Sequence, residues 1–487
     1  MKKLVKILAF VLCLAMTASV FACAAPAAPA AEEPAAAPAA EPAAEPAAEP
    51  AAETAETAEA PALEPCTLVW IGAGWQANGK AETIIQKWNE IHPDIKIEYT
   101  ELGSLVDTDY LKNLDIMIAG GETVDVTYLG TQDMYNRVMN GGALPITQYI
   151  NENGDDYVAE FTSLAATSCK YQDDIYGIPY SNNTFKVFYN KTMVEEAGIT
   201  IPETWSYQEF TEVAKQLNKD GVYGCVYPST WEDLCYAPAE VSGWQSIKVA
   251  DDGTVSPNFD DEVFKTCLQW IYDLAEVDKV SPSRATIMAE SLNRRRALAT
   301  GQTAMIVDGP YTLVWMQNYM FNDPGEGPLT FELGVAELPY ITEEGKNVSF
   351  DSLVGAFYVP KTSAHPREAY AFEHFICTEC SGIANYMPTY TGADMEQATE
   401  TFTTYIDANG ETHENVYPKE VAIAAVSVPN ESHISHWNRD PAYAQYFSLM
   451  ATLFAEQYSL FLGGEQTMDD FVANMQQLGA AEIANVG

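Results

Sequence analysis

The sequence predicts an α/β fold divided into two lobes. Apolar segments at residues 67–71, 95–99 and 124–129 alternate with amphipathic stretches, and this βαβαβ order is typical of a parallel sheet with helices on both faces. Residues 66–487 are too many for one compact hydrophobic core, which favours two lobes. Residues 1–65 have a different composition and are not expected to belong to this fold.

The first strand and helix follow from the apolar pattern. Residues 67–71 form a short apolar run that is typical of a buried strand. Residues 81–91 repeat apolar side chains at helical spacing, with one face made of Ile84, Ile85, Trp88 and Ile91. The helix should end at His92, because Pro93 disfavours helical backbone at the residue before it.

The next elements complete a first sheet. Residues 95–99 alternate like a strand, and residues 105–119 are expected to form a helix. Gly120 and Gly121 should end that helix, after which residues 124–129 form the third strand.

Later elements are separated by more turns. We expect strands at residues 187–189, 304–307 and 355–360, and helices at residues 262–275, 291–300 and 366–377. The C-terminal region has two apolar helical faces, made of Tyr443, Phe447, Met450 and Phe454 and of Phe471, Met475 and Leu478.

Residues 1–22 predict a secretory signal peptide. Lys2, Lys3 and Lys6 precede an apolar stretch that is too short for a membrane-spanning helix. Cys23 follows the small residue Ala22, as in a bacterial lipobox, so we expect its thiol to be lipidated. Two acyl chains on that residue would hold the protein at the membrane. Phe21 is not typical of the motif, and ordinary cleavage with an unmodified Cys23 is the alternative.

Residues 23–65 predict a disordered tether that begins at the lipidated cysteine. The segment repeats Ala, Pro and Glu and contains no aromatic residue, so it cannot bury enough apolar surface to fold. Its prolines and like charges should keep it extended. We therefore expect an exported protein that is anchored to the outer face of the cell membrane.

The charge of the chain excludes several partners. Sixty-nine acidic residues against 25 basic ones give a formal net charge of −44 at pH 7. Nucleic acid, anionic lipid and polyanionic substrates are therefore not expected to bind. The charge alone does not select a ligand, because most of it should lie on a solvated surface.

Cysteine and histidine give no clear metal or disulfide signature. The number of cysteines in the folded part is odd, which argues against a disulfide framework. Cys377 and Cys380 form a C-x-x-C pair, and His433 and His436 form a second weak pair, but neither has partners at ligand spacing. We predict no metal site and no cofactor.

Catalytic signatures are also missing. The sequence has no G-x-S-x-G, P-loop or H-E-x-x-H motif. Residues 72–77 read G-x-G-x-x-A after the first strand, but Asn78 and Gly79 delay the helix that would bind a pyrophosphate, and Trp75 is bulky at that place. This loop is better interpreted as a ligand-contacting loop at the carboxyl end of the first strand. The chain is not expected to be an enzyme.

Aromatic residues stand next to polar ones at the expected loops. Each could separately belong to a core, but as a group they favour a carbohydrate site, because a sugar offers apolar ring faces and a rim of hydroxyl groups. The aromatic members are Trp75, Tyr128, Tyr180, Trp231, Trp244, Tyr311 and Trp437.

Ordered motifs resemble one known family from about residue 67 to the C-terminus. Residues 85–98 are similar to the family's first helix and second strand, and residues 118–125 to its A-A-G-x-x-P-D-V block, with Val124 in place of proline. Residues 174–180 and residues 301–311 carry its most specific blocks; the second ends in Gly-Pro-Tyr where the family has Gly-Pro-Trp. The chain thus resembles extracellular solute-binding proteins of family 1, the maltose- and oligosaccharide-binding type.

The resemblance implies a clamp of the periplasmic-binding-protein type (type II). Each lobe would hold a mostly parallel sheet flanked by helices, and hinge crossovers would join the lobes near residues 176–179 and 351–355. The implied N-terminal lobe comprises residues 66–178 and about 352–415. The implied C-terminal lobe comprises residues 179–351 and about 416–487.

The resemblance also implies which residues contact the ligand. From the N-terminal lobe and the first crossover these are Trp75, Asp125, Tyr128, Gln132, Asp133, Tyr180 and Asn183. From the second lobe they are Trp231, Tyr311, Asp351, Trp437, Arg439 and Tyr443. Tyr311 would be a stacking platform, and Gln132, Asp133 and Asn183 would pair with hydroxyl groups.

The implied function is capture of a carbohydrate, such as an oligosaccharide, by a monomeric protein that delivers it to the permease of an ABC importer. The same fold could instead bind another solute, such as a polyamine or a phosphorylated polyol. Asp125, Asp133, Asp308 and Asp351 could pair a cationic ligand. A surface glycoside hydrolase is the third possibility, although nothing in the sequence selects a pair of carboxylates for it.

Overall fold

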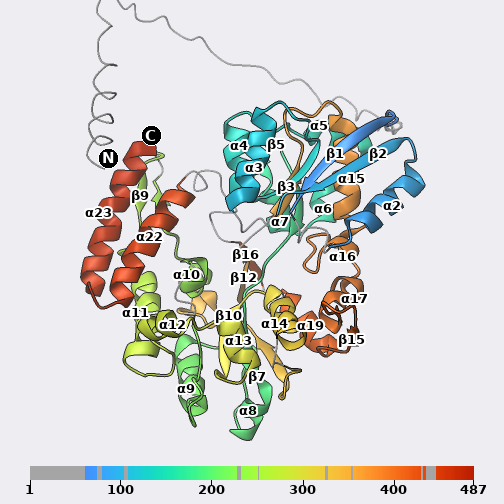
Figure 1. Ribbon diagram of the computed structural model, residues 1–487. Coiled ribbons are helices and arrows are strands. Elements are labelled where there is room, and N and C mark those ends of the chain that lie inside the picture. The colour runs from blue at the N-terminus through green and yellow to red at the C-terminus, as the bar shows by residue number, and fades with distance from the viewer. Residues whose placement is uncertain are drawn as a thin grey trace, which may run out of the picture. The chain divides into compact units, whose positions relative to one another are not determined.

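The computed structural model describes residues 61–73, 79–103, 108–227, 232–250, 252–323, 327–351, 355–428, 431–434 and 446–486 (Figure 1). Ala58–Gly487 form one compact unit. The predicted signal peptide, Cys23 and nearly all of the predicted tether lie outside the described residues.

The first sheet has five strands in the order β2-β1-β3-β13-β6. Strand β1 (Cys66–Gly72) pairs in parallel with β2 (Ile95–Glu101) and with β3 (Val126–Gly130). Strand β13 (Gly355–Tyr358) comes from much later in the chain and lies antiparallel between β3 and β6 (Ile178–Ser181). The predicted βαβαβ order is confirmed, and a late strand completes the sheet.

Helices cover both faces of this sheet, because successive strand residues point to opposite sides. One face packs against α2 (Ala81–Ile91) and α15 (Pro366–Cys377). The other face packs against α3 (Thr108–Ala119) and α4 (Thr131–Met139), and Figure 1 shows the two groups of helices on either side of β1 and β3. Helix α2 has the predicted bounds, but Ile91 is exposed because it lies at the end of the helix.

The second sheet has three strands in the order β10-β7-β11. Both β10 (Met305–Asp308) and β11 (Leu333–Ala336) pair antiparallel with β7 (Lys186–Asn190). Isolated parallel bridges also join Val226 to Ile306 of β10 and Tyr223 to Thr303 just before it. The prediction of a mostly parallel sheet in each lobe is therefore wrong for these three strands. Apolar patterns locate strands, whereas strand direction depends on the path of the long connections between them.

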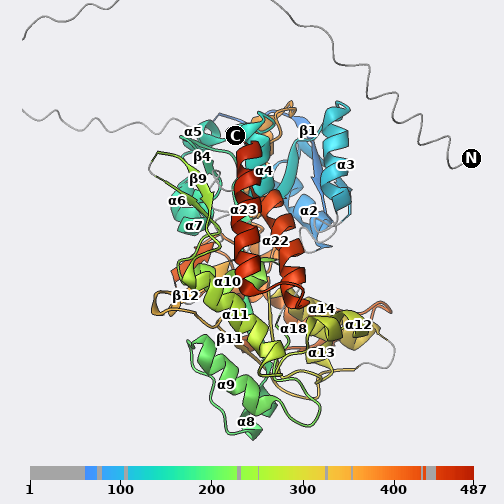
Figure 2. The same ribbon diagram turned by 90° about the vertical axis from the view of Figure 1, so that its left-hand side faces the viewer.

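Apolar residues cover both faces of the second sheet as well. Val187 and Phe188, neighbours on β7, belong to two different cores. The C-terminal helices α22 (Phe447–Leu462) and α23 (Met468–Val486) lie side by side and pack on the Val187 side, as Figure 2 shows. Both predicted C-terminal helices are confirmed.

Short elements complete the fold. The further helices are α5 (Thr147–Asn153), α6 (Tyr157–Glu160), α7 (Ser163–Thr167), α8 (Lys191–Glu196), α9 (Tyr207–Leu217), α10 (Glu232–Val241), α11 (Glu262–Glu276), α12 (Arg284–Glu290), α13 (Arg294–Ala299), α14 (Tyr311–Asn322), η2 (Glu343–Gly345), α16 (Ser381–Ala384), α17 (Met395–Ala398), α18 (Glu400–Thr403) and α19 (Lys419–Val426). The further strands are β4 (Lys170–Tyr171), β5 (Asp174–Ile175), β8 (Ile247–Val249), β9 (Val255–Pro257), β12 (Val348–Asp351), β14 (Thr404–Ile406), β15 (Thr412–Glu414) and β16 (Glu431–Ile434).

The chain passes between the two sheets more than once. Residues 178–190 lead from β6 to β7, and Ala384 still packs with the first sheet. Met387 and Phe402 already pack with Phe188 of the second sheet. The exact division of residues 352–415 between the lobes stays a prediction.

Candidate functional site

Several chain segments leave the first sheet at one edge. Gly355 pairs with Gly130 on one side and with Ser181 on the other, so the carboxyl ends of β3 and β6 lie at the same edge of the sheet, on either side of the start of β13. Helix α4 begins directly after Gly130, and residues 182–185 lead from Ser181 into β7. Open α/β sheets bind their ligands at this edge. We call the row Gly130, Ser181 and Gly355 the carboxyl edge.

Two predicted ligand contacts, Tyr128 and Tyr180, lie in the core beneath the carboxyl edge. Their rings meet edge to face at 5.2 Å, and both are almost fully buried. The Tyr128 hydroxyl is 3.0 Å from Oγ of Ser181, and the Tyr180 hydroxyl donates to the carbonyl of Ala384 at 2.5 Å. These tyrosines are therefore core residues that pack beneath the carboxyl edge.

Gly355 is required by that arrangement. A Cβ at this position would lie 1.5 Å from the Tyr128 hydroxyl oxygen and 2.0 Å from its Cζ. Only a glycine lets β13 pass this close to the ring. The position of β13, and thus the edge itself, depends on it.

Gln132 and Asp133 stand in the first turn of α4, directly at the carboxyl edge. Oε1 of Gln132 is buried and has no hydrogen-bond partner among the described residues. Burial raises the pKa of Asp133 to about 6, although Arg137 lowers it, and Asp115 raises it further. Gln132 thus carries a buried oxygen without a partner among the described residues, and Asp133 carries a carboxyl with a perturbed pKa; both features are common at ligand-binding sites.

Asp125 lies at the opposite end of β3. Its Oδ2 accepts from the backbone N–H of Val69 at 2.9 Å, and its Oδ1 accepts from Oγ of Ser363 at 2.6 Å. The side chain is fully buried. The structure therefore does not bring Asp125 together with Gln132 and Asp133; it links β1 and β3 to the segment before α15.

Asn183 and Tyr311 come together around Gly309. A Cβ on Gly309 would meet Cε1 of Tyr311 at 2.4 Å and Oδ1 of Asn183 at 2.6 Å, so both side chains lie against this residue. The pairing of Asp308 with Lys186 explains the contact, because it sets the end of β10 beside the entry to β7. The structure thus brings a predicted stacking platform and a predicted hydroxyl partner together.

A buried ion cluster lies directly behind Tyr311. Asp308 is fully buried and accepts from Nε of Arg294 at 2.9 Å and from Nε of Arg295 at 2.7 Å. Burial alone would raise the pKa of Asp308, but the two guanidinium groups outweigh it and lower the pKa to about 2. Asp308 is therefore already neutralised by two arginines. Asp125 already accepts hydrogen bonds from Val69 and Ser363, so neither carboxylate is available to a cationic ligand.

Sequence reasoning missed an aromatic stripe on α14. Tyr311, Trp315 and Tyr319 are four residues apart, and Trp315 is 48% exposed. The Arg295 guanidinium lies 4.9 Å from the Tyr311 ring and 5.7 Å from the Trp315 ring, a cation–π arrangement. Two signals in the sequence could have indicated this stripe. One is the four-residue spacing of the three aromatic residues, and the other is the run of three arginines at residues 294–296, which is unusual in so acidic a chain.

The remaining predicted contacts lie at the end of β12 or outside the described ranges. Asp351 ends β12 and pairs with Ile434 of β16. Five predicted residues lie outside the described ranges: Trp75, Trp231, Trp437, Arg439 and Tyr443.

A cavity of about 710 Å³ lies away from the carboxyl edge. Phe321, Leu329, Val335 and Tyr417 are among the residues that line it. None of the predicted ligand contacts belongs to its lining. Over the described ranges, no helix has the length and apolar character needed to cross a membrane.

Comparison with known proteins places this fold in a family. The model of the bacterial extracellular solute-binding protein family matches residues 71–378. An uncharacterised lipoprotein of Streptomyces antibioticus is 26% identical over 257 residues, 51% of this chain and 54% of the relative. A maltotriose-binding protein of Pyrococcus abyssi is 23% identical over 270 residues, 54% of this chain and 51% of that protein. The chain thus matches about half the length of these curated relatives.

Solved structures share the fold at low sequence identity. A sugar transporter from Rhizobium etli in an open conformation is 17% identical with a TM-score of 0.68, covering 85% of this chain and 98% of that one. A substrate-binding protein from Listeria monocytogenes in complex with cycloalternan is 19% identical with a TM-score of 0.64, covering 84% and 97%. These similarities show the two-lobed α/β fold that the sequence predicts. The match of the family model over most of the folded part shows that the chain belongs to the bacterial extracellular solute-binding proteins.

Proposed function

We propose that this protein captures a carbohydrate outside the cell and delivers it to the permease of an ABC importer without chemical change. The observation that carries the proposal is the stripe of Tyr311, Trp315 and Tyr319 beside Asn183. Aromatic faces of this kind suit the apolar faces of sugar rings, and nearby amides suit their hydroxyl groups. The names of the Pyrococcus abyssi relative and of the sugar-bound structural neighbours agree with this reading.

The proposed site combines two groups of residues. Tyr311, Trp315 and Asn183 supply stacking and one amide, and Gln132 and Asp133 at the carboxyl edge supply further polar atoms. Tyr128, Tyr180 and Asp125 are left out, because burial and existing hydrogen bonds occupy them. Binding that contacts both groups would favour a closed arrangement of the lobes, which the permease could recognise.

The cationic alternative finds less support at these residues. Asp308 is neutralised by Arg294 and Arg295, and Arg295 faces the stripe. A positive group at the stripe disfavours a polyamine. Export, the lipid anchor at Cys23, the monomeric state and the permease partner belong to the same proposal and rest on the N-terminal sequence and on family membership.

Calorimetry and thermal shift on residues 58–487 test the proposal. The panel contains mono- and oligosaccharides, a polyamine and glycerol phosphate, and a sugar at 100-fold its Kd should stabilise the protein by about 2.7 kcal/mol. Trp315→Ala should weaken sugar binding by about tenfold, or about 1.4 kcal/mol, with little change in stability because the ring is half exposed. Ile116→Ala, another exposed apolar position on a helix, is the matched control.

Three results would contradict the proposal. These are a shift with the polyamine and none with any sugar, equal sugar affinity in Trp315→Ala and the control, and release of reducing ends from an oligosaccharide by the purified protein.

A further inference from the structure

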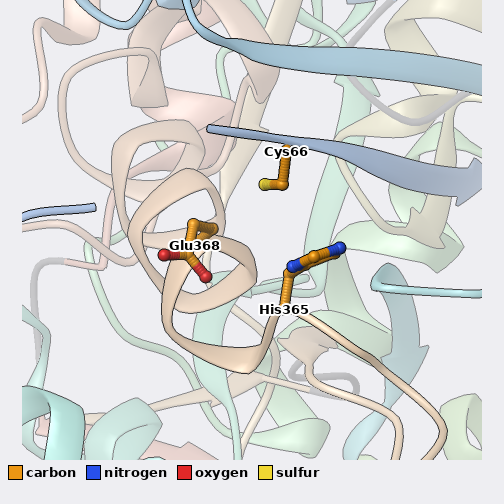
Figure 3. A group of neighbouring side chains, drawn as sticks. All are labelled: Cys66, His365 and Glu368. Carbon is orange, nitrogen blue, oxygen red and sulfur yellow. The ribbon is translucent and has the colours of Figure 1, made fainter. Parts of the chain in front are cut away.

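A cysteine, a histidine and a glutamate meet at the end of the first sheet that lies opposite the carboxyl edge. Cys66 is the first residue of β1, His365 directly precedes α15, and Glu368 lies in the first turn of that helix. One sulfur, one ring nitrogen and one carboxylate oxygen lie within 4.8 Å of one another. Figure 3 shows the three side chains facing one another between the strand and the helix.

Hydrogen bonds to neighbouring groups hold this arrangement in place. Ser363 accepts from the backbone N–H of His365 at 3.2 Å and donates to Asp125. Oε1 of Glu368 accepts from the backbone N–H of Glu64 at 2.9 Å. These contacts fix the backbone at His365 and the position of the Glu368 carboxylate.

Two of the three donor groups, those of Cys66 and His365, are uncommitted. Among the described residues, neither the thiol of Cys66 nor the imidazole of His365 has a hydrogen-bond partner, and Glu368 is 6% exposed.

Two other clusters with ligand-type residues differ in this respect. In one, Nε2 of His374 is 2.9 Å from Glu160, and Asp155 accepts from the hydroxyl of Tyr370. In the other, Asp407 accepts two backbone N–H groups of its own turn and lies 3.3 Å from Nε2 of His413. The histidine of each of these two clusters already has a carboxylate partner, whereas Cys66 and His365 have no hydrogen-bond partner among the described residues.

The set of donors selects the metal. Sulfur and nitrogen ligands with one carboxylate are typical of zinc, whereas calcium and magnesium require oxygen ligands. In a tetrahedral zinc site the donor atoms lie about 3.3–3.8 Å apart. The three donor atoms here lie within 4.8 Å of one another, so small side-chain rotations can bring them to that spacing. Three protein ligands leave the fourth position to water.

We propose that Cys66, His365 and Glu368 bind a zinc ion that fastens the beginning of the folded chain to the start of α15. The site joins residues that are far apart in sequence, so an ion there would hold β1 to the helix that covers it. The ion would lie where the N-terminal segment enters the fold. Any force that the predicted tether transmits would reach the folded part at this point.

Cobalt and zinc titrations of the full chain, purified in detergent, stripped of metal and reduced, test this proposal. One equivalent of Co²⁺ should give the visible bands of tetrahedral cobalt and a thiolate-to-cobalt charge-transfer band, and Zn²⁺ should displace it. Cys66→Ser should abolish the charge-transfer band, and Glu368→Gln and His365→Ala should each weaken binding at least tenfold. Cys23→Ala, Cys225→Ala and His92→Ala should leave the titration unchanged.

A second measurement does not depend on whether a variant folds. Zinc-edge X-ray absorption of the wild-type chain should show one sulfur and otherwise nitrogen or oxygen neighbours per ion. No thiolate band, no sulfur neighbour, two or more sulfurs, or a Cys66→Ser titration equal to that of the wild type would overturn the proposal. Zinc should also raise the melting temperature of the wild type and not that of Cys66→Ser.

Discussion

Replacing Asp308 by asparagine should destabilise the protein strongly. Asn keeps the size of the side chain and removes its charge, so Arg294 and Arg295 lose their counter-ion while their side chains remain only 16% and 13% exposed. A pKa lowered from 3.8 to about 2 corresponds to about 2 kcal/mol of stability. Breaking a buried ion pair by removing one partner costs about 3–5 kcal/mol, which sets the upper end of the expected loss.

Urea unfolding at pH 7.5 measures this loss, with Asp260→Asn as the control because Asp260 is exposed. The folded pKa of Asp308 is below the unfolded one, so its contribution is fully present above about pH 4 and is lost as the pH falls toward 2. The difference between wild type and Asp308→Asn should shrink over that range. A variant as stable as Asp260→Asn at pH 7.5 would refute the role of the ion cluster.

Two further substitutions test the carboxyl edge. Gly355→Ala should cost at least about 2 kcal/mol or prevent folding, because its Cβ would lie 1.5 Å from the Tyr128 hydroxyl oxygen; a melting temperature equal to that of the wild type would contradict this. Asp133→Asn should stabilise the protein above pH 6, because burial raises the folded pKa of Asp133 above its unfolded value and the charged form is disfavoured. Below about pH 4 the gain should vanish, and a gain that does not depend on pH would show another cause.

The sequence predicts the parts of the fold that depend on local patterns. Residues 81–91 become α2 with the same bounds, because apolar spacing and Pro93 act within one segment. Nothing local indicates that β13 inserts antiparallel between β3 and β6, because that position depends on contacts with Gly130 and Ser181, far away in the sequence. The direction of β10 and β11 against β7 was missed for the same reason.

The position of a candidate site residue was predictable where its motif also fixes its place relative to a strand. Gly309 and Tyr311 follow the end of β10, so the motif that contains them places Tyr311 at the end of that strand. The antiparallel pairing of Asp308 with Lys186 then brings it to the entry to β7. Asp125 belongs to an equally clear motif, yet it precedes β3 and lies at the other end of the strand from Gln132. Asp125 and Gln132 are close in sequence, but β3 lies between them and places them at opposite ends of the strand.

That separation gives the first sheet two independent ends. Strand β1 has seven residues, so about 20 Å divides Cys66 from the carboxyl edge. Groups so far apart with no shared partner contribute additively to stability, unless a two-state element connects them. Zinc at Cys66 should therefore raise the melting temperature without altering sugar affinity, and sugar should leave zinc affinity unchanged. A change of more than about twofold in either affinity would mean that lobe closure is energetically coupled to the zinc site at the start of β1.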